Sequence, residues 1–334
     1  MGGFLAASTT DLIQSIVMMI ALVVVVAYGT HIAGGTDAVI ENARSLPGYL
    51  SLINTHNVET GNAQNYGFLT TISTLAWGLG YFGMPHILLR FMAIENEEKL
   101  VLSRRIATVW VVISMFVAIL IGIIGYGASV AGVLPMFETS SESETIIIRL
   151  AGLLAEKNFL LALVAGVVLA GILACTMSTA DSQLLTAASS VSQNLLQDFM
   201  KIKMSPKQSM LAARLTVVGI SLVAVILAWN PDSSVFYIVS FAWAGFGASF
   251  GPVVLFSLFW RRTNFQGALA GMLTGGVMVF VWKYLVKPMG GVWGIYELLP
   301  AFILGCIAIV VVSLATEAPS EEILKEFDSI KEEK

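Results

Sequence analysis

The amino-acid sequence predicts an all-α protein that crosses a membrane about eight times, with one crossing helix broken near residues 77–85. Three observations support this fold class. The chain of 334 residues is 57% hydrophobic and only 12% charged, whereas a soluble domain carries roughly 25% charged residues. Its apolar residues form long runs, and a crossing helix needs about 20 of them. Its lysines and arginines gather in the connections on one side.

Eight apolar runs are long enough to cross the hydrocarbon layer. They lie at about 12–29, 67–92, 106–130, 158–180, 210–229, 234–260, 266–286 and 297–315. We expect no strand, because an open sheet edge leaves backbone groups unpaired in lipid. With eight crossings, most of the 18 lysines and arginines lie on the side of the membrane that also holds the N-terminus. This bias predicts that both termini are cytoplasmic. Membrane lipid is the expected surrounding partner, and a net charge of −4 without a basic block argues against nucleic acid.

The connections between these runs differ in character. Residues 30–66 form a long polar connection, with a short helix expected at 37–44. Residues 93–105 form a patch of mixed charge that we expect outside the membrane. Residues 136–157 are acidic and then amphipathic, with apolar residues at helical spacing. Residues 317–334 predict a charged, solvated helix.

The second run contains helix-breaking residues at mid-membrane. Residues 76–85 read AWGLGYFGMP, with three glycines before Pro85. Proline removes a backbone N–H and clashes with the preceding turn, and a broken helix at this depth survives only within protein or beside a cavity. Trp77 and Tyr81 share one face if the helix persists that far. The pattern indicates a binding site, and the alternative is a proline kink with ordinary aromatic packing.

Polar residues also cluster where the fourth run ends, at residues 174–183 (ACTMSTADSQ). The hydroxyls of Ser178 and Thr179, with a backbone carbonyl one turn earlier, offer oxygens of the kind that hard cations prefer. Ser178, Asp181 and Ser182 lie on one helix face. The alternative is that these hydroxyls bond to carbonyls of the preceding turn at a solvated helix end.

Asp11 precedes the first apolar run. It either caps that helix or is a functional carboxylate beside the membrane. Its predicted depth equals that of Asp181, so the two carboxylates could share a cation. Cys175 and Cys306 both lie in apolar runs and are best explained as small packing residues.

Small residues recur in the sixth and seventh runs. Residues 241–252 (FAWAGFGASFGP) end in Gly-Pro, and Ser249 within them matches the hydrolase elbow G-x-S-x-G. That motif requires a strand-turn-helix setting, so we reject it and predict that the protein is not an enzyme. Gly267, Gly271 and Gly275 predict close helix packing.

These segments together resemble the sodium:solute symporter family. The resemblance rests on Trp77 to Arg90, Met177-Ser178-Thr179, Phe241 to Trp260, and the pattern from Ser257 to Val277. It covers essentially the whole chain and is greatest to the members that carry proline. It implies sodium-coupled symport of a small solute, most closely L-proline, into the cell, with sodium as the co-transported ion. The fold that it implies is an inverted-repeat transporter of two five-helix repeats with extra helices, here a partial one.

The resemblance also assigns roles to single residues. It implies a sodium site at the carbonyl of Cys175 and the hydroxyls of Ser178 and Thr179, and a second sodium site at Asp11, Ser178, Asp181 and Ser182. The family more often has alanine at position 175, which a backbone ligand tolerates, and serine at position 181, which weakens the second assignment. The solute would meet Trp77, Gly78, Tyr81 and Pro85, with Trp243 as a gate.

The same resemblance implies a division of the single transmembrane domain. Residues 1–29 would form the last helix of the first repeat, 67–260 the second repeat, 266–316 two peripheral helices and 317–334 a cytoplasmic tail. The first four core helices have no counterpart, and residues 2–6 resemble the end of the family's first signature, so we expect a fragment. The alternatives are a non-transporting remnant, a sensor-like protein and, least favoured, an intramembrane enzyme.

Overall fold

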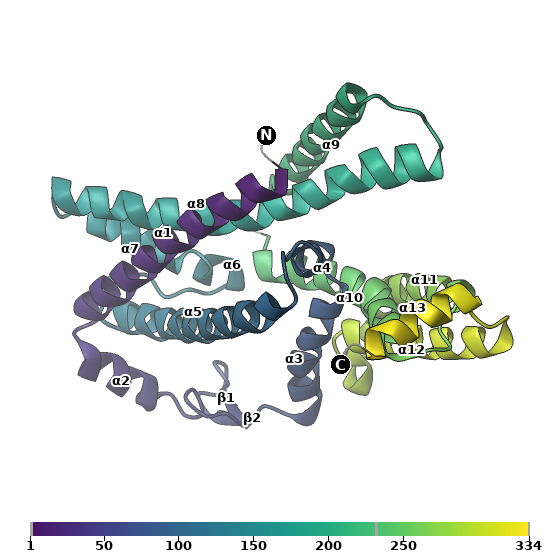
Figure 1. The fold of residues 1–334 in the computed structure, drawn as a ribbon. Coiled ribbons are helices and arrows are strands. Elements are labelled where there is room, and N and C mark those ends of the chain that lie inside the picture. Colours follow the sequence, from purple (N-terminus) through teal and green to yellow (C-terminus); the bar gives the residue numbers. More distant parts are fainter. Residues whose placement is uncertain (1–2, 231–232, 333–334) are drawn as a thin grey trace. The chain divides into compact units, whose positions relative to one another are not determined.

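The computed structural model describes residues 3–230 and 233–332, and these are almost entirely helical (Figure 1). The helices of the first two-thirds are α1 (Gly3–Ile32), α2 (Thr36–Ser45), α3 (Phe68–Gly80), α4 (Pro85–Met92), α5 (Glu98–Val130), α6 (Ser140–Ser143), α7 (Ile146–Ala155), α8 (Phe159–Ser189) and α9 (Pro206–Leu227). They are followed by α10 (Val235–Phe259), α11 (Phe265–Val281), α12 (Leu298–Ala315) and α13 (Glu321–Glu332). Shorter pieces are η1 (Tyr81–Gly83), η2 (Ser190–Phe199), η3 (Trp282–Val286), η4 (Lys287–Met289) and η5 (Gly291–Gly294).

Seven helices in the described part of the chain are long and apolar enough to cross a membrane. They are α1, α5, α8 with η2, α9, α10, α11 with η3 and η4, and α12. The remaining predicted crossing, 67–92, is divided between α3 and α4. The predicted class of an all-α polytopic membrane protein with a broken helix near 77–85 is therefore confirmed.

The chain divides into two compact units. The first comprises Met1–Gln64 and Ile94–Val235, and the second comprises Asn65–Ala93 and Phe236–Lys334. In the first unit α1 lies alongside α8 and also packs on α5 (Figure 1). Buried apolar residues from these helices and α7 form its core, among them Ala21, Val25, Ile121, Ile124, Ala128, Leu150, Leu154 and Val168.

The core of the second unit lies where α10, α11 and α12 meet. Its buried residues are Ala244, Ala248, Val279, Leu298, Ala301 and Phe302. The glycines Gly267, Gly271 and Gly275 are buried on α11, where side chains would overlap Ser313, Ile309 and Ala248 respectively. The predicted close packing of this helix is confirmed. The charged tail helix α13 follows α12. Its Asp328 carboxylate forms an ion pair at 2.8 Å with the guanidinium of Arg261, which follows α10.

Several helices begin at polar caps in the sequence. The side-chain oxygens of Asn158 and Asn264 accept the backbone N–H three residues on, at the starts of α8 and α11. Ser205 and Gln208 cap each other at the start of α9, where Pro206 occupies the first helical position. These contacts satisfy N–H groups that have no acceptor within the helix. The predicted short helix at 37–44 and the predicted amphipathic helix after residue 145 also form, as α2 and α7.

Two expectations about helix ends were wrong. α1 begins at Gly3, so Asp11 lies inside the helix and does not cap it. α8 does not end near residue 180 but continues to Ser189 and, as the π-helix η2, to Phe199. The hydroxyls of its polar segment bond to carbonyls of the same helix, so polarity there does not stop the helix.

Within the mixed-charge patch after residue 93, α5 begins at Glu98 and Lys99 pairs with Glu95, which does not bear on that patch's expected place outside the membrane. One further expectation was wrong. Strands do occur: β1 (Asn54–His56) pairs with β2 (Ala63–Asn65) in the polar connection. The argument against strands applied to hydrocarbon, and these two short strands lie outside the apolar runs.

Candidate functional site

The interruption of the second crossing lies where its glycines and proline predict it. α3 ends at Gly80, a 3₁₀ turn covers Tyr81–Gly83, Met84 is extended, and α4 begins at Pro85. Proline fits the first position of a helix because its missing N–H would have no helical acceptor there. The last carbonyls of α3 and the first amides of α4 therefore lie outside any continuous α-helical ladder. Backbone polar groups of this kind can bind a polar solute.

Aromatic rings gather around Trp77 within the second unit. Its indole stacks at nearly parallel angles on Phe236 (5.5 Å, 11°), Trp243 (5.7 Å, 16°) and Tyr296 (5.9 Å, 16°). Tyr81 meets Trp243 edge-on, with ring centroids 4.8 Å apart. Each such pair contributes about 0.5–1.5 kcal/mol beyond the apolar area that it buries. The structure thus brings together two predicted solute residues and the predicted gate.

A hydrogen bond fixes this stack to the break. The indole N–H of Trp243 donates to the carbonyl of Trp77 at 2.9 Å. A partly buried indole needs an acceptor, and the Trp77 carbonyl in the last turn of α3 provides it. The bond therefore joins α10 to the turn that precedes the break.

Glycines let the broken helix approach α10 at backbone distance. A Cβ at Gly80 would overlap the Trp243 indole, and one at Gly83 would meet the backbone at Gly247 and Gly251. A Cβ at Gly78 would meet nothing within 4 Å, so this predicted solute residue lies on the open side of α3. Pro85, the fourth of the predicted set, is half-buried.

The predicted sodium residues lie in the first unit, in the middle of the long helix formed by α8 and η2. The Ser178 hydroxyl donates to the Cys175 carbonyl at 3.0 Å, and the Ser182 hydroxyl donates to the Ser178 carbonyl at 3.1 Å. This is the back-bonded arrangement named above as the alternative to a cation site. The first of these bonds joins Cys175 O and Ser178 Oγ, two of the oxygens that the predicted sodium site would use.

Thr179 and Asp181 differ in exposure. Thr179 is exposed, and its hydroxyl has no hydrogen-bond partner within the ranges that the structure describes. Asp181 is half-buried and follows it by half a turn, on the side of Ser178 and Ser182. These positions leave the Thr179 hydroxyl able to turn toward an ion.

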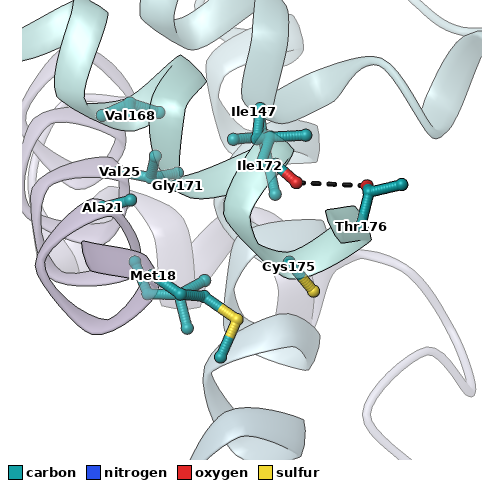
Figure 2. Close-up of a pocket in the computed structure, with 10 residues that line it drawn as sticks. Met18, Ala21, Val25, Ile147, Val168, Gly171, Ile172, Cys175 and Thr176 are labelled. Atoms are coloured by element: carbon teal, nitrogen blue, oxygen red, sulfur yellow. Dashed lines mark hydrogen bonds between the residues drawn. The ribbon is translucent and has the colours of Figure 1, made fainter. Parts of the chain in front are cut away.

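A pocket of about 210 Å³ lies between α1 and α8, and its lining residues show which parts of the two helices face each other (Figure 2). Met18 and Val25 of α1 line it together with Cys175 and Val168 of α8. Because residue numbers rise along α1 as they fall along α8, the two helices run in opposite directions. Asp11 lies two turns before Met18 on α1, and Ser182 lies two turns after Cys175 on α8. Because the helices are antiparallel, both residues lie about 10 Å from the pocket along the helices, on the same side of it.

This alignment places the four residues of the predicted second sodium site on two facing helices. Gln14, one turn from Asp11, shares its face of α1, and the alignment places it at the level of Ser178. Its side-chain oxygen is buried without a hydrogen-bond partner among the described residues. An unpaired buried oxygen costs about 1–3 kcal/mol, and a cation is one partner that would offset that cost.

Gln14, Phe236 and Tyr296 are the residues that sequence reasoning missed. The spacing of Gln14 from Asp11 was a usable signal, because residues three apart lie on one helix face. Phe236 and Tyr296 belong to segments with no motif, and only the fold brings them to Trp77. The predicted solute residues all lie in the second unit, and the predicted sodium residues all lie in the first.

Comparison with known proteins gives a consistent result. The model of the sodium:solute symporter family matches residues 1–275. The chain is 38% identical over 331 residues to the sodium/proline symporter of Escherichia coli (strain K12), covering 98% of this chain and 61% of the relative. It is 38% identical over 328 residues to the high-affinity proline transporter PutP of Bacillus subtilis (strain 168), covering 98% and 64%.

A third relative is the sodium/proline symporter of Haemophilus influenzae, at 38% identity over 330 residues, or 98% of this chain and 63% of the relative. The chain thus spans about three-fifths of the length of these curated relatives. The family match covers most of the chain, including the broken helix, the polar segment of α8 and the glycines of α10. The chain belongs to the sodium:solute symporter family.

Proposed function

We propose that this chain serves in sodium-coupled symport of a small solute, L-proline, into the cell. The observation that carries the proposal is the broken helix, where Trp77, Tyr81 and Trp243 lie beside backbone groups outside any continuous helix. Membership of the family supports sodium as the coupled ion. The 38% identity to the sodium/proline symporter of Escherichia coli supports proline as the solute.

The chemistry of the break suits an amino acid. The amide end of α4 carries partial positive charge, which favours the proline carboxylate, and the carbonyl end of α3 favours its ammonium group. The apolar pyrrolidine ring would pack on Trp77 and Tyr81, and the open side of Gly78 leaves room for it. Pro85 keeps α4 starting at this point, and Trp243 covers the site as its gate.

Sodium would bind on α8. The Cys175 carbonyl and the Ser178 hydroxyl lie 3.0 Å apart, and rotation of the hydroxyl away from that carbonyl would free both oxygens for an ion, with Thr179 as a third ligand. The proposed second site comprises Asp11, Ser178, Asp181 and Ser182. The antiparallel alignment of α1 with α8 and the unpaired oxygen of Gln14 support it.

Coupling in this proposal involves no covalent step, so no enzyme activity is proposed. An ion shifts a conformational equilibrium only by its difference in affinity between the two states. If sodium favours the state that binds proline, proline favours the state that binds sodium to the same degree. We place the chain in the plasma membrane with cytoplasmic termini, α1 as the last helix of the first repeat, α3–α10 as the second, and α11 and α12 as peripheral helices.

Uptake of labelled proline into proteoliposomes tests this proposal. An inward sodium gradient should drive uptake above the level reached with an equal gradient of choline, and unlabelled proline should compete. Binding of proline that needs sodium, but without uptake, would instead indicate a sensor or a remnant. A protein that shows neither proline binding nor proline uptake would refute the proposal.

A further inference from the structure

The segment before α12 reaches the broken helix through one residue. Tyr296 stacks on Trp77 at 5.9 Å, and its backbone N–H donates to the hydroxyl of Ser73, one turn earlier on α3, at 3.0 Å. These two contacts lie on the same side of α3. Tyr296 therefore holds both the ring and the backbone of the turn that precedes the break.

The phenol group of Tyr296 extends the contact to a second helix. Its hydroxyl donates to the carbonyl of Ser240 on α10 at 2.6 Å. Ser240 lies one turn before Trp243, the residue that covers Trp77 and binds its carbonyl. Tyr296 thus bridges α3 and α10, the two helices that carry Trp77 and Trp243.

A buried ion pair keeps Tyr296 in place. The neighbouring Glu297 is only 2% exposed, and its carboxylate accepts from Lys287 at 2.8 Å. A buried carboxylate is costly unless it is paired, so Glu297 stays beside Lys287. Leu298 follows and is fully buried in the core of the second unit. The residues after Tyr296 are therefore anchored independently of any contact that Tyr296 makes.

We propose that Tyr296 is a positioning residue of the solute site: it sets the plane of the Trp77 ring and the separation of α3 from α10. This inference rests on the proposed function for its effect on transport. Because the contacts of Tyr296 described above all lie within the second unit, and the predicted sodium residues belong to the first, its loss should change solute affinity. Sodium activation should stay unaltered when proline is supplied at the same multiple of its KM.

The decisive variant is Tyr296→Phe, which keeps the ring and the backbone N–H but removes the bridge to Ser240. The expected result is a rise of about fivefold in the KM for proline, the usual effect of one lost hydrogen bond, with the half-saturating sodium concentration unchanged. Ser73→Ala should act in the same direction. Tyr284→Phe is the matched control, because Tyr284 packs on Phe241 and not on Trp77.

A second measurement does not depend on transport. The stacked Trp77 and Trp243 rings should give a coupled signal in near-ultraviolet circular dichroism, which its loss in Trp77→Phe would assign. Tyr296→Phe should reduce that signal and Tyr284→Phe should not. An unchanged signal with an unchanged KM, or equal effects of the two tyrosine variants, would overturn the inference.

The two measurements separate the possible failures. Wild-type protein that shows no sodium-dependent proline uptake counts against the proposed function, while the dichroism still decides whether Tyr296 positions Trp77. A different result would count only against the positioning role of Tyr296. In that result the wild type takes up proline, and Tyr296→Phe loses maximal rate in proportion to the loss of folded protein while its KM stays unchanged.

Discussion

Trp243 of α10 donates its indole N–H to the carbonyl of Trp77 of α3 at 2.9 Å, and the two rings stack at 5.7 Å. Trp243 therefore binds the carbonyl of Trp77 and also stacks on its ring. The partners are 166 positions apart in the chain, so this contact exists only in the folded protein. It connects the turn of α3 before the break with Trp243, the predicted gate.

Trp243→Phe should weaken this link. Phenylalanine keeps a stacking ring but loses the hydrogen bond to the Trp77 carbonyl, at a cost of about 0.5–1.5 kcal/mol. We expect a lower Tm in detergent and a raised KM for proline. Trp229→Phe is the control, because Trp229 is 81% exposed; an equal loss in both variants would contradict the assignment.

Gly80→Ala should lower the thermal stability of the protein, whereas Gly78→Ala should lower only the affinity for proline, because its Cβ would occupy the space proposed for the pyrrolidine ring. The new Cβ at position 80 would overlap the Trp243 indole, which cannot retreat without breaking its hydrogen bond. Overpacking of this kind costs about 1–3 kcal/mol. The same change at Gly78 meets open space and favours the helix by about 0.5–1 kcal/mol. Thermal unfolding of both variants, followed by proline uptake, checks the contrast.

Ser178→Ala and Thr179→Ala should each raise the sodium concentration needed for half-maximal uptake, by about tenfold or more. Each variant removes one oxygen from the proposed ion site, and a polar contact to a charged group contributes about 1.5–3 kcal/mol. Thr176→Val serves as control, since Thr176 bonds only to Ile172 within the described helix. Sodium activation that is unchanged in both alanine variants would rule out this site.

Glu297→Gln and Lys287→Met should each destabilise the second unit, and the double variant should be less affected than the sum of the two. Removing one partner leaves the other charge without compensation, at a cost of about 3 kcal/mol for the buried carboxylate. The two residues bond at 2.8 Å, close enough to couple. Unfolding measurements on all four proteins form the double-mutant cycle, and strict additivity would show that the pair does not interact.

The Tyr296 hydroxyl should remain a donor through the physiological pH range. Burial, and then the charge of Glu297, raise the pKa of Tyr296 above its ordinary value of 10.0. A raised pKa means that the stabilising contribution is complete below pH 10 and is lost only as the pH rises through the higher folded-state value. The Tm difference between wild type and Tyr296→Phe should therefore be constant from pH 7 to about 9, and a marked change within that range would contradict the bond to Ser240.

Local rules account for much of this fold. The break at Gly80–Pro85 follows from residues that cannot continue a helix, and Asn158, Ser205 and Asn264 start helices because their side chains cap them. The aromatic character of the predicted solute site also follows from local sequence, since Trp77 and Tyr81 flank the glycines. The predicted gate, Trp243, was placed only by resemblance.

The errors have two physical causes. The end of α8 was misjudged because Ser178 and Ser182 satisfy their hydroxyls within the helix, so polar residues did not require water there. Tyr296 could not be foreseen, because its partner Ser73 is 223 positions away and no pattern in the loop marks it. Contacts of such separation are decided by packing of the whole unit.

Gly83 faces Gly247 and Gly251 across the contact between the broken helix and α10. When one member of an ordinary packed pair grows, its neighbour can shrink and restore the fit during evolution. Here neither neighbour can shrink, since each already lacks a side chain. Second-site suppressors of an enlarged residue at position 83 should therefore be rare at the contact itself and should arise where whole helices can shift.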